Sequence, residues 1–402
     1  MNGVMLLRNT IMEYPWGSRE AIAGLMGQKS PSDQPQAELW MGAHSRAPSM
    51  VVTPSGEVPL PDLIDSDPDG LLGKNTSHSS DGKLPFLFKI LAAAEPLSIQ
   101  VHPDMDQARA GFEREQRLGI PLDAENRNYR DRNHKPEILC AMTPFWALKG
   151  FRDPGEIFSL LRELHSPTLD SEMEVSKDKP DGMDFPSFYE KFLKFPAGMG
   201  KKIIREVVEG INRTGPRTEA HKWLLSLHDF HPDDVSVLHA LILNLVILEP
   251  GEALFAQAGE LHAYLRGTGV ELMANSDNVL RGGLTSKHMD IPELLRVLKF
   301  MKSEIRILRP RQLPSGEQLY DCPVREFLLS SLEVRGGKPY SGARQRSIEI
   351  WITIKGAAKV TAKGTGTVTL VRQGQSFLIP ASVPAYTIEG EAYFFRASVP
   401  AS

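Results

Sequence analysis

A short alternation of polar and apolar residues offers the first candidate for site chemistry. Ser98, Gln100 and His102 alternate with Ile99 and Val101, and in an extended strand this alternation places the two sets on opposite faces. Gln100 and His102 then present an amide oxygen and an imidazole nitrogen to one point, which suits a divalent metal. Two ligands do not make a site, and a half-buried strand with one solvated polar face would explain the same pattern.

Two later segments supply further donors. In the segment 133–137, proline favours an extended backbone, so Lys135 and Glu137 should project from the same face. That pair is either part of a site or an ordinary surface ion pair. Farther along, a strand, a Pro-Gly turn and a second strand bring in His262, as expected near the mouth of a small antiparallel barrel. The four candidate donors together suit a zinc ion with an open coordination position. They are Gln100, His102, Glu137 and His262.

Charged residues lie in the same segments. Arg281 and Lys287, in a glycine-containing loop, could hold a phosphate group, the arginine by bidentate bonding and the lysine as a point charge. A solvated loop explains either residue about equally well. Lys89 interrupts an apolar run at 84–91, where its side chain is expected to snorkel outward rather than to meet an anion.

The elements that must position these residues fall into three parts. Strand-like alternation over 1–150 and 241–300 predicts a catalytic β domain, with short helices near 60–64, 105–118 and 291–298. Helical periodicity over 151–240 predicts a helical insertion. Residues 301–402 read as a second β barrel or sandwich with a structural role. The histidines of the insertion lack ligand-like spacing and are not expected to act as metal ligands. They are His165, His221, His228, His231 and His239.

Composition narrows the possible partners. The chain has 402 residues, 41% of them hydrophobic, and a formal net charge of −4, so no bulk attraction to nucleic acid or to an anionic membrane is expected. No export signal or membrane-spanning run is evident, and the two cysteines, Cys140 and Cys322, form no disulfide framework. A cytoplasmic protein is expected. It is also expected to be a monomer, because no long exposed apolar stripe is evident.

Several long motifs occur in a characteristic order. They are Tyr14-Pro15-Trp16-Gly17, Ala37-Glu38-Leu39-Trp40-Met41-Gly42-Ala43-His44, Leu97-Ser98-Ile99-Gln100-Val101-His102-Pro103-Asp104, His134-Lys135-Pro136-Glu137 and the block from Gly259 to Lys287. With them the chain resembles the type I mannose-6-phosphate isomerases, zinc-dependent enzymes of the cupin superfamily. The resemblance implies a mainly β fold, with two cupin-like jelly-roll barrels and an α-helical domain.

The resemblance also implies roles for individual residues. One zinc ion per chain would be bound by the four donors named above, and Arg281 would be the active-site arginine. Lys135, His134, Asp277 and Glu271 are the other candidate catalytic residues, Lys135 as a cation near the substrate and the other three as possible bases. Substrate contacts are expected from Trp16, Glu38, Lys89, Ser98, Tyr264 and Lys287.

The implied reaction is the interconversion of mannose 6-phosphate and fructose 6-phosphate through a cis-enediol, feeding GDP-mannose synthesis. A base must take the proton from C2, and a fixed cation must stabilise the charge that develops on the sugar oxygens. The sequence does not choose among His134, Glu271 and Asp277 as that base. Two alternatives are a non-catalytic cupin that binds a sugar phosphate and a metal-dependent cupin dioxygenase.

Overall fold

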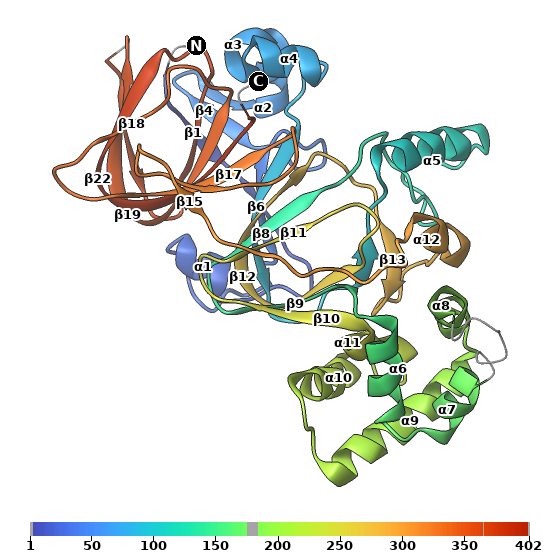
Figure 1. Cartoon of the computed structure of the whole chain (residues 1–402). Helices are drawn as coiled ribbons and strands as arrows, with labels where there is room; N and C mark the ends of the chain where they lie inside the picture. The colour runs from blue at the N-terminus through green and yellow to red at the C-terminus, as the bar shows by residue number, and fades with distance from the viewer. Residues whose placement is uncertain (1–2, 175–183, 365, 401–402) are drawn as a thin grey trace.

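The structure is a computed structural model that describes residues 3–174, 184–364 and 366–400. Its strands form two sheets, with a group of helices attached to one of them (Figure 1). The strands of the first sheet are β2 (Thr10–Met12), β3 (Glu38–Gly42), β6 (Phe86–Ala93), β7 (Ile99–Val101), β8 (Glu137–Ala141), β9 (Phe145–Phe151), β10 (Leu243–Leu248), β11 (Ala253–Ala256), β12 (His262–Ala274), β13 (Leu280–Gly283) and β14 (Ile307–Leu308).

The second sheet combines strands from both ends of the chain. They are β1 (Met5–Arg8), β4 (Met50–Thr53), β5 (Gly56–Pro59), β15 (Arg311–Gln312), β16 (Gln318–Tyr320), β17 (Leu328–Val334), β18 (Tyr340–Ser341), β19 (Glu349–Lys363), β20 (Val368–Arg372), β21 (Ser376–Ile379) and β22 (Ala385–Ser398). β1 pairs with β21 on one side and with β4 on the other. The predicted division into domains at residues 150, 240 and 300 stays a prediction. It did not include a pairing of the N-terminal strand β1 with the C-terminal strand β21.

The helices fall into two groups. Those of the segment 154–242 lie together at one end of the molecule (Figure 1). They are α6 (Pro154–Arg162), α7 (Pro167–Glu174), α8 (Phe185–Leu193), α9 (Ala197–Thr214), α10 (Glu219–Phe230), the 3-10 helix η2 (Val235–Leu238) and α11 (His239–Ile242). The others are α1 (Ala21–Leu25), α2 (Leu60–Ser66), α3 (Pro68–Leu72), α4 (Lys74–Ser79), α5 (Met105–Arg117) and α12 (Ile291–Val297). The predicted class, mainly β with a helical insertion, is confirmed, as are the helices expected near 60–64, 105–118 and 291–298.

The long strand β12 organises the first sheet. One half of it pairs with β7 and β9, and the other half with β6 and β8. The register sets His262 opposite Gln100 at one end and Glu271 opposite Lys89 at the other. His262 and Glu271 are nine residues apart, so strict alternation would place them on opposite faces, but the pairing of β12 with β9 shifts register between Tyr264 and Arg266.

The apolar face of β7 is buried, as its alternation predicted. Ile99 and Val101 are fully buried in a core that they share with the helical segment, whose contributions include Leu227 and Leu241. The helices therefore cover the back of the strand that carries Gln100. Of the helices that the structure describes, none combines the length and the apolar character that crossing a membrane would require.

Candidate active site

The structure brings the four predicted metal donors together. His262 on β12 lies opposite Gln100 on β7, while His102 directly follows β7 and Glu137 begins β8. One donor atom from each of His102, Glu137 and His262 lies within 4.8 Å of the others. The Glu137 carboxylate reaches both rings, with Oε1 3.4 Å from His102 Nε2 and Oε2 3.3 Å from His262 Nε2.

Backbone carbonyls fix the orientation of both imidazole rings. His102 Nδ1 lies 2.8 Å from the Asn278 carbonyl oxygen, and His262 Nδ1 lies 3.0 Å from that of Glu260. Each Nδ1–H donates to its carbonyl, so each Nε2 turns a lone pair toward Glu137. This arrangement is typical of histidines that ligate a metal. Burial lowers the pKa of His102 to about 4, which favours the neutral, ligating form.

The donor atoms that face one another in this group suit a bound cation. His102 Nε2 and Glu137 Oε2 are buried and lack a hydrogen-bond partner among the described residues. Burial alone would raise the pKa of Glu137, but Lys135, with its ammonium 3.3 Å from Oε1, and the histidines hold it well below the usual value. The Gln100 amide nitrogen lies 3.4 Å from His262 Nε2. A half-turn of that amide would present its oxygen instead, completing two oxygen and two nitrogen donors suited to zinc.

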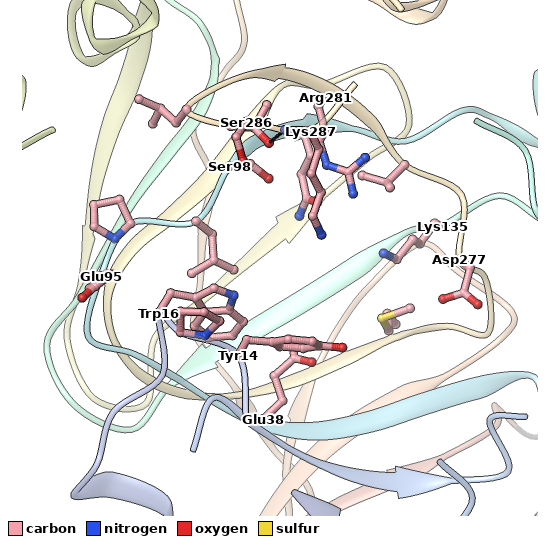
Figure 2. A pocket seen from close by; sticks show the side chains of 18 of the residues that line it. Tyr14, Trp16, Glu38, Glu95, Ser98, Lys135, Asp277, Arg281, Ser286 and Lys287 are labelled. Carbon is pink, nitrogen blue, oxygen red and sulfur yellow. Dashed lines mark hydrogen bonds between the residues drawn. The ribbon is translucent and has the colours of Figure 1, made fainter. Parts of the chain in front are cut away.

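A cavity of about 630 Å³ opens beside this group. The predicted site residues that line it are Trp16, Glu38, Lys89, Ser98, Gln100, Lys135, Asp277, Arg281 and Lys287. In Figure 2, Arg281 and Lys287 reach into the cavity from one side, near Ser98, while Trp16, Tyr14 and Glu38 face them from the other. Lys135 and Asp277 lie close together at one end.

Positive charge is concentrated on one side of the cavity. Burial, and then the charge of Arg130, lower the pKa of Arg281. Burial likewise lowers the pKa of Lys287, with contributions from Arg281, Arg130 and Arg46. Such mutual repulsion favours binding of an anion, because an anion relieves it. Arg46 and Arg130 also line the cavity, and sequence reasoning missed both because they reach it from loops without a strand or helix period.

Lys89 does not snorkel outward, and that expectation was wrong. It lies on β6 between β3 and β12, which leaves its ammonium group inside the sheet, 2.9 Å from Glu271 and 3.4 Å from Glu38. Burial would lower the pKa of Lys89, but the two carboxylates raise it above the usual value. Trp40 donates its indole N–H to Glu38 at 2.7 Å, which holds that carboxylate at the cavity wall.

The three candidate bases have different surroundings. Of these three residues, only Asp277 lines the cavity. His134 turns to the opposite side, where its Nε2 lies 2.7 Å from Glu326 Oε1. Glu271 is buried and paired with Lys89. Tyr264, expected to contact substrate, is buried as well and is not among the cavity-lining residues described.

Asp277 is held in place from two directions. Its backbone N–H donates to Asp131 Oδ2 at 2.7 Å, and its Oδ2 lies 3.3 Å from His44 Nε2. Burial would raise the pKa of Asp277, but His44, Arg46 and Lys135 lower it to about 2. The carboxylate is therefore ionised at neutral pH.

The helical segment also reaches the cavity. Phe230, the last residue of α10, and His231 after it line the cavity together with Thr285 and Ser286. His231 is thus part of the cavity wall but not of the metal group formed by His102, Glu137 and His262. Its position depends on how α10 packs against the first sheet, and the local sequence carries no sign of that packing. Phe230 is 44% exposed.

Comparisons with known proteins show which family this chain belongs to. Residues 4–154 match the family model for the catalytic domain of type I phosphomannose isomerase. The chain is 37% identical over 394 residues to the mannose-6-phosphate isomerase of Escherichia coli (strain K12), covering 97% of this chain and 98% of that protein. It is 31% identical over 407 residues to the mannose-6-phosphate isomerase of Homo sapiens, covering 94% of each.

Solved structures resemble the chain over nearly its whole length. A zinc-bound mannose 6-phosphate isomerase superposes with a TM-score of 0.90 at 34% identity, covering 98% of this chain and 99% of that one. A variant of the phosphomannose isomerase from Salmonella typhimurium gives the same TM-score, identity and coverage.

Proposed function

Because the chain belongs to the type I phosphomannose isomerase family, we propose that it interconverts mannose 6-phosphate and fructose 6-phosphate with the help of zinc. The buried group of His102, Glu137 and His262, opening onto a cation-rich cavity, is the observation that supports this function best. The two alternatives, a non-catalytic sugar-phosphate receptor and a dioxygenase, lack support, since the relatives are named as isomerases.

The phosphate of the substrate is proposed to bind at Arg281 and Lys287, with Ser98 beside them. These side chains converge on one side of the cavity (Figure 2), where burial first, and neighbouring positive charges second, lower the pKa of each. A dianion there is favoured by bidentate bonding to the guanidinium and by the point charge of the ammonium. Anchoring the phosphate orients the rest of the sugar toward Lys135 and Asp277.

Zinc is proposed to be held by Gln100, His102, Glu137 and His262, where it would act as a Lewis acid toward a sugar oxygen. Lys135 lies between this group and the cavity, 3.3 Å from Glu137, and can donate to the oxygen atoms on which negative charge develops.

Asp277 is proposed to move the proton, since it is the candidate base that reaches the cavity. Its carboxylate takes the proton from C2 of the open-chain aldose, and the electron pair of that C–H bond forms the C1–C2 double bond while the C1=O π pair moves onto O1. A proton then passes from the O2 hydroxyl to O1. As the O2 electron pair forms the C2=O bond of the ketose, the C1–C2 π pair takes the proton back from the same carboxylate at C1. A pKa of about 2 makes Asp277 a weak base, so the reaction depends on cations that stabilise the enediolate.

A coupled assay tests this function. The purified chain is expected to form fructose 6-phosphate from mannose 6-phosphate, to lose activity after dialysis against a chelator, and to regain it when zinc is added back. Absence of product from the zinc-loaded chain, or turnover that chelation leaves unchanged with the metal verifiably removed, would refute the proposal.

We also propose that the protein acts as a monomer in the cytoplasm. The exposed large apolar side chains described are spread over separate elements, such as Leu118 beside α5, Ile247 on β10 and Leu370 on β20. Both Cys140 and Cys322 are free thiols, as expected in a reducing compartment. Light scattering after size exclusion should give the mass of one chain, 44.6 kDa.

A further inference from the structure

One contact joins the second sheet to the segment that carries the catalytic residues. His134 Nε2 and Glu326 Oε1 lie 2.7 Å apart, and about a quarter of each side chain is exposed, 25% and 24%. Glu326 comes just before Phe327, which is 1% exposed in a core formed by both sheets, and before β17. The carboxylate therefore projects from a firmly anchored part of the molecule.

His134 lies in an extended segment directly before β8. Side chains in such a segment alternate, so Lys135 and Glu137 face the cavity and the metal group while His134 faces the other way. Residues 133–136 lie outside the strands, and the backbone contact next to Lys135 is that of the Ala274 N–H, which donates to the Pro136 carbonyl oxygen at 3.1 Å. The opposite edge of the segment is secured by Asn278, which donates its amide to the Asn133 carbonyl at 2.9 Å.

We propose that Glu326 is a positioning residue for the isomerase reaction, holding His134 so that Lys135 keeps its ammonium group between Glu137 and the substrate. This inference rests on the proposed function of the cavity. It assigns the C-terminal part of the chain a share in catalysis in addition to the structural role expected from its sequence.

The electrostatics of the contact support this assignment. Burial would raise the pKa of Glu326, but the hydrogen bond and the charge of His134 lower it below its usual value. Glu326 is therefore an ionised acceptor, and hydrogen bonds to ionised acceptors are shorter and stronger than neutral ones. A displacement of about 1 Å at a catalytic group can lower turnover about 100-fold, so one strong tether near Lys135 has a large effect.

Another contact between the same parts of the molecule provides a matched control. The Tyr320 hydroxyl donates to the Gly251 carbonyl oxygen at 2.9 Å and accepts from Cys140 Sγ at 3.1 Å. Tyr320 is 1% exposed, and neither of these contacts involves residues 133–136. Tyr320→Phe therefore removes hydrogen bonds between the two sheets and leaves the contact between His134 and Glu326 in place.

The experiment compares Glu326→Ala, Glu326→Gln and Tyr320→Phe with the unaltered chain, all loaded with zinc. Glu326→Ala is expected to lower kcat by about tenfold or more, with KM changed less than about twofold. Glu326→Gln keeps an oxygen acceptor and should recover most of the lost turnover. Tyr320→Phe should lower the unfolding temperature while kcat stays within about twofold. Zinc content should be equal in all four proteins.

A double substitution tests whether Glu326 acts through His134. His134→Ala and the pair His134→Ala with Glu326→Ala should have the same kcat, because the second change removes a tether whose target is already gone. Additive losses would overturn the inference, as would unchanged kinetics of Glu326→Ala or an equal loss of kcat in Tyr320→Phe.

Failure of the proposed function is distinguishable from failure of this inference. If the proposed function is wrong, the unaltered chain is itself inactive. Amide hydrogen exchange then tests separately whether Glu326 holds the segment of His134. Glu326→Ala should speed amide exchange at residues 133–135, and Tyr320→Phe should leave it unchanged. Equal protection in Glu326→Ala and the unaltered chain would overturn the inference whatever the activity.

Discussion

The metal group and the proposed phosphate site hold their side chains in different ways. His102 and His262 are oriented by backbone carbonyls, so the geometry of the metal group belongs to the framework of the first sheet. Arg281 and Lys287 instead extend from β13 and from the loop after it into the cavity. Substitutions in the two places should therefore have separable effects.

Arg281→Ala is expected to lower kcat/KM by about 100-fold while zinc content stays full, because its charge acts on the substrate. Gln100→Ala is the matched comparison from the neighbouring strand, since the register sets Arg281 opposite Gln100. That variant should lose zinc affinity first and activity only as a consequence. Metal analysis beside steady-state kinetics checks both, and a parallel loss of zinc and activity in Arg281→Ala would refute its assignment.

The pH dependence of substrate binding should report Lys287. Its pKa lies below the ordinary value of 10.5 through burial and neighbouring arginines, so above that lowered pKa the free enzyme loses one charge that holds phosphate. We expect kcat/KM to be highest below this pKa and to fall as the pH rises through it. In Lys287→Arg the decline should disappear or move upward, because a guanidinium does not titrate there. An identical decline in both proteins would contradict the assignment.

Among the elements, β13 and the 3-10 helix η2 approach each other closely. Gly283 has φ of 152°, and a Cβ added there would lie 2.5 Å from Ser236 Cβ. The Ser236 hydroxyl accepts the backbone N–H of Leu284 at 2.8 Å. A glycine is required because the helical segment approaches the backbone two residues after Arg281. The insertion thus supports the active-site strand directly.

The end of α10 should influence substrate binding rather than the chemical step. Phe230→Ala removes apolar surface from the cavity wall, and losing about 40 Å² of contact would cost about 1 kcal/mol, or about fivefold in KM, with kcat nearly unchanged.

Leu370→Ala is a matched control for Phe230→Ala. Leu370 is similarly exposed, at 46%, and lies on β20, outside the set of described residues that line the cavity. Steady-state kinetics on mannose 6-phosphate decides the question. Equal KM values in the two variants would exclude Phe230 from substrate binding.

In the whole molecule, one hydrophobic core spans both sheets. It contains Ile90 and Val270 of the first sheet together with Leu7, Ile350 and Leu378 of the second. The strands of the second sheet come from both chain ends, so neither end has a complete sheet without the other. We therefore do not expect the C-terminal part to fold stably on its own.

A chain that stops at residue 300 should fail to fold cooperatively. It would leave β1 without β21 and expose the core faces of β3 and β6. Calorimetry should show no unfolding transition comparable to that of the intact chain, and much of the material should aggregate. A soluble, cooperatively unfolding fragment that binds zinc would contradict this expectation and would support independent domains.

Much of the candidate site can be predicted from the sequence because it depends on local geometry. Alternation in an extended segment sets Gln100 and His102 on one face, and it sets Lys135 beside Glu137, as the 3.3 Å contact confirms. The pattern of a strand, a Pro-Gly turn and a second strand pointed to the remaining donor, His262. The strand period of two residues is a property of the backbone, so these relations hold whatever the rest of the chain does.

Only the tertiary structure decided what each of these faces meets. The carboxylates around Lys89, the turn of His134 toward Glu326 and the arrival of Phe230 at the cavity all join residues far apart along the chain. Such contacts follow from strand register and from the packing of shared cores, which depend on many distant residues together. The linear sequence therefore settled which groups could do the chemistry, and the packing of the two sheets with the helices settled which of them face the cavity.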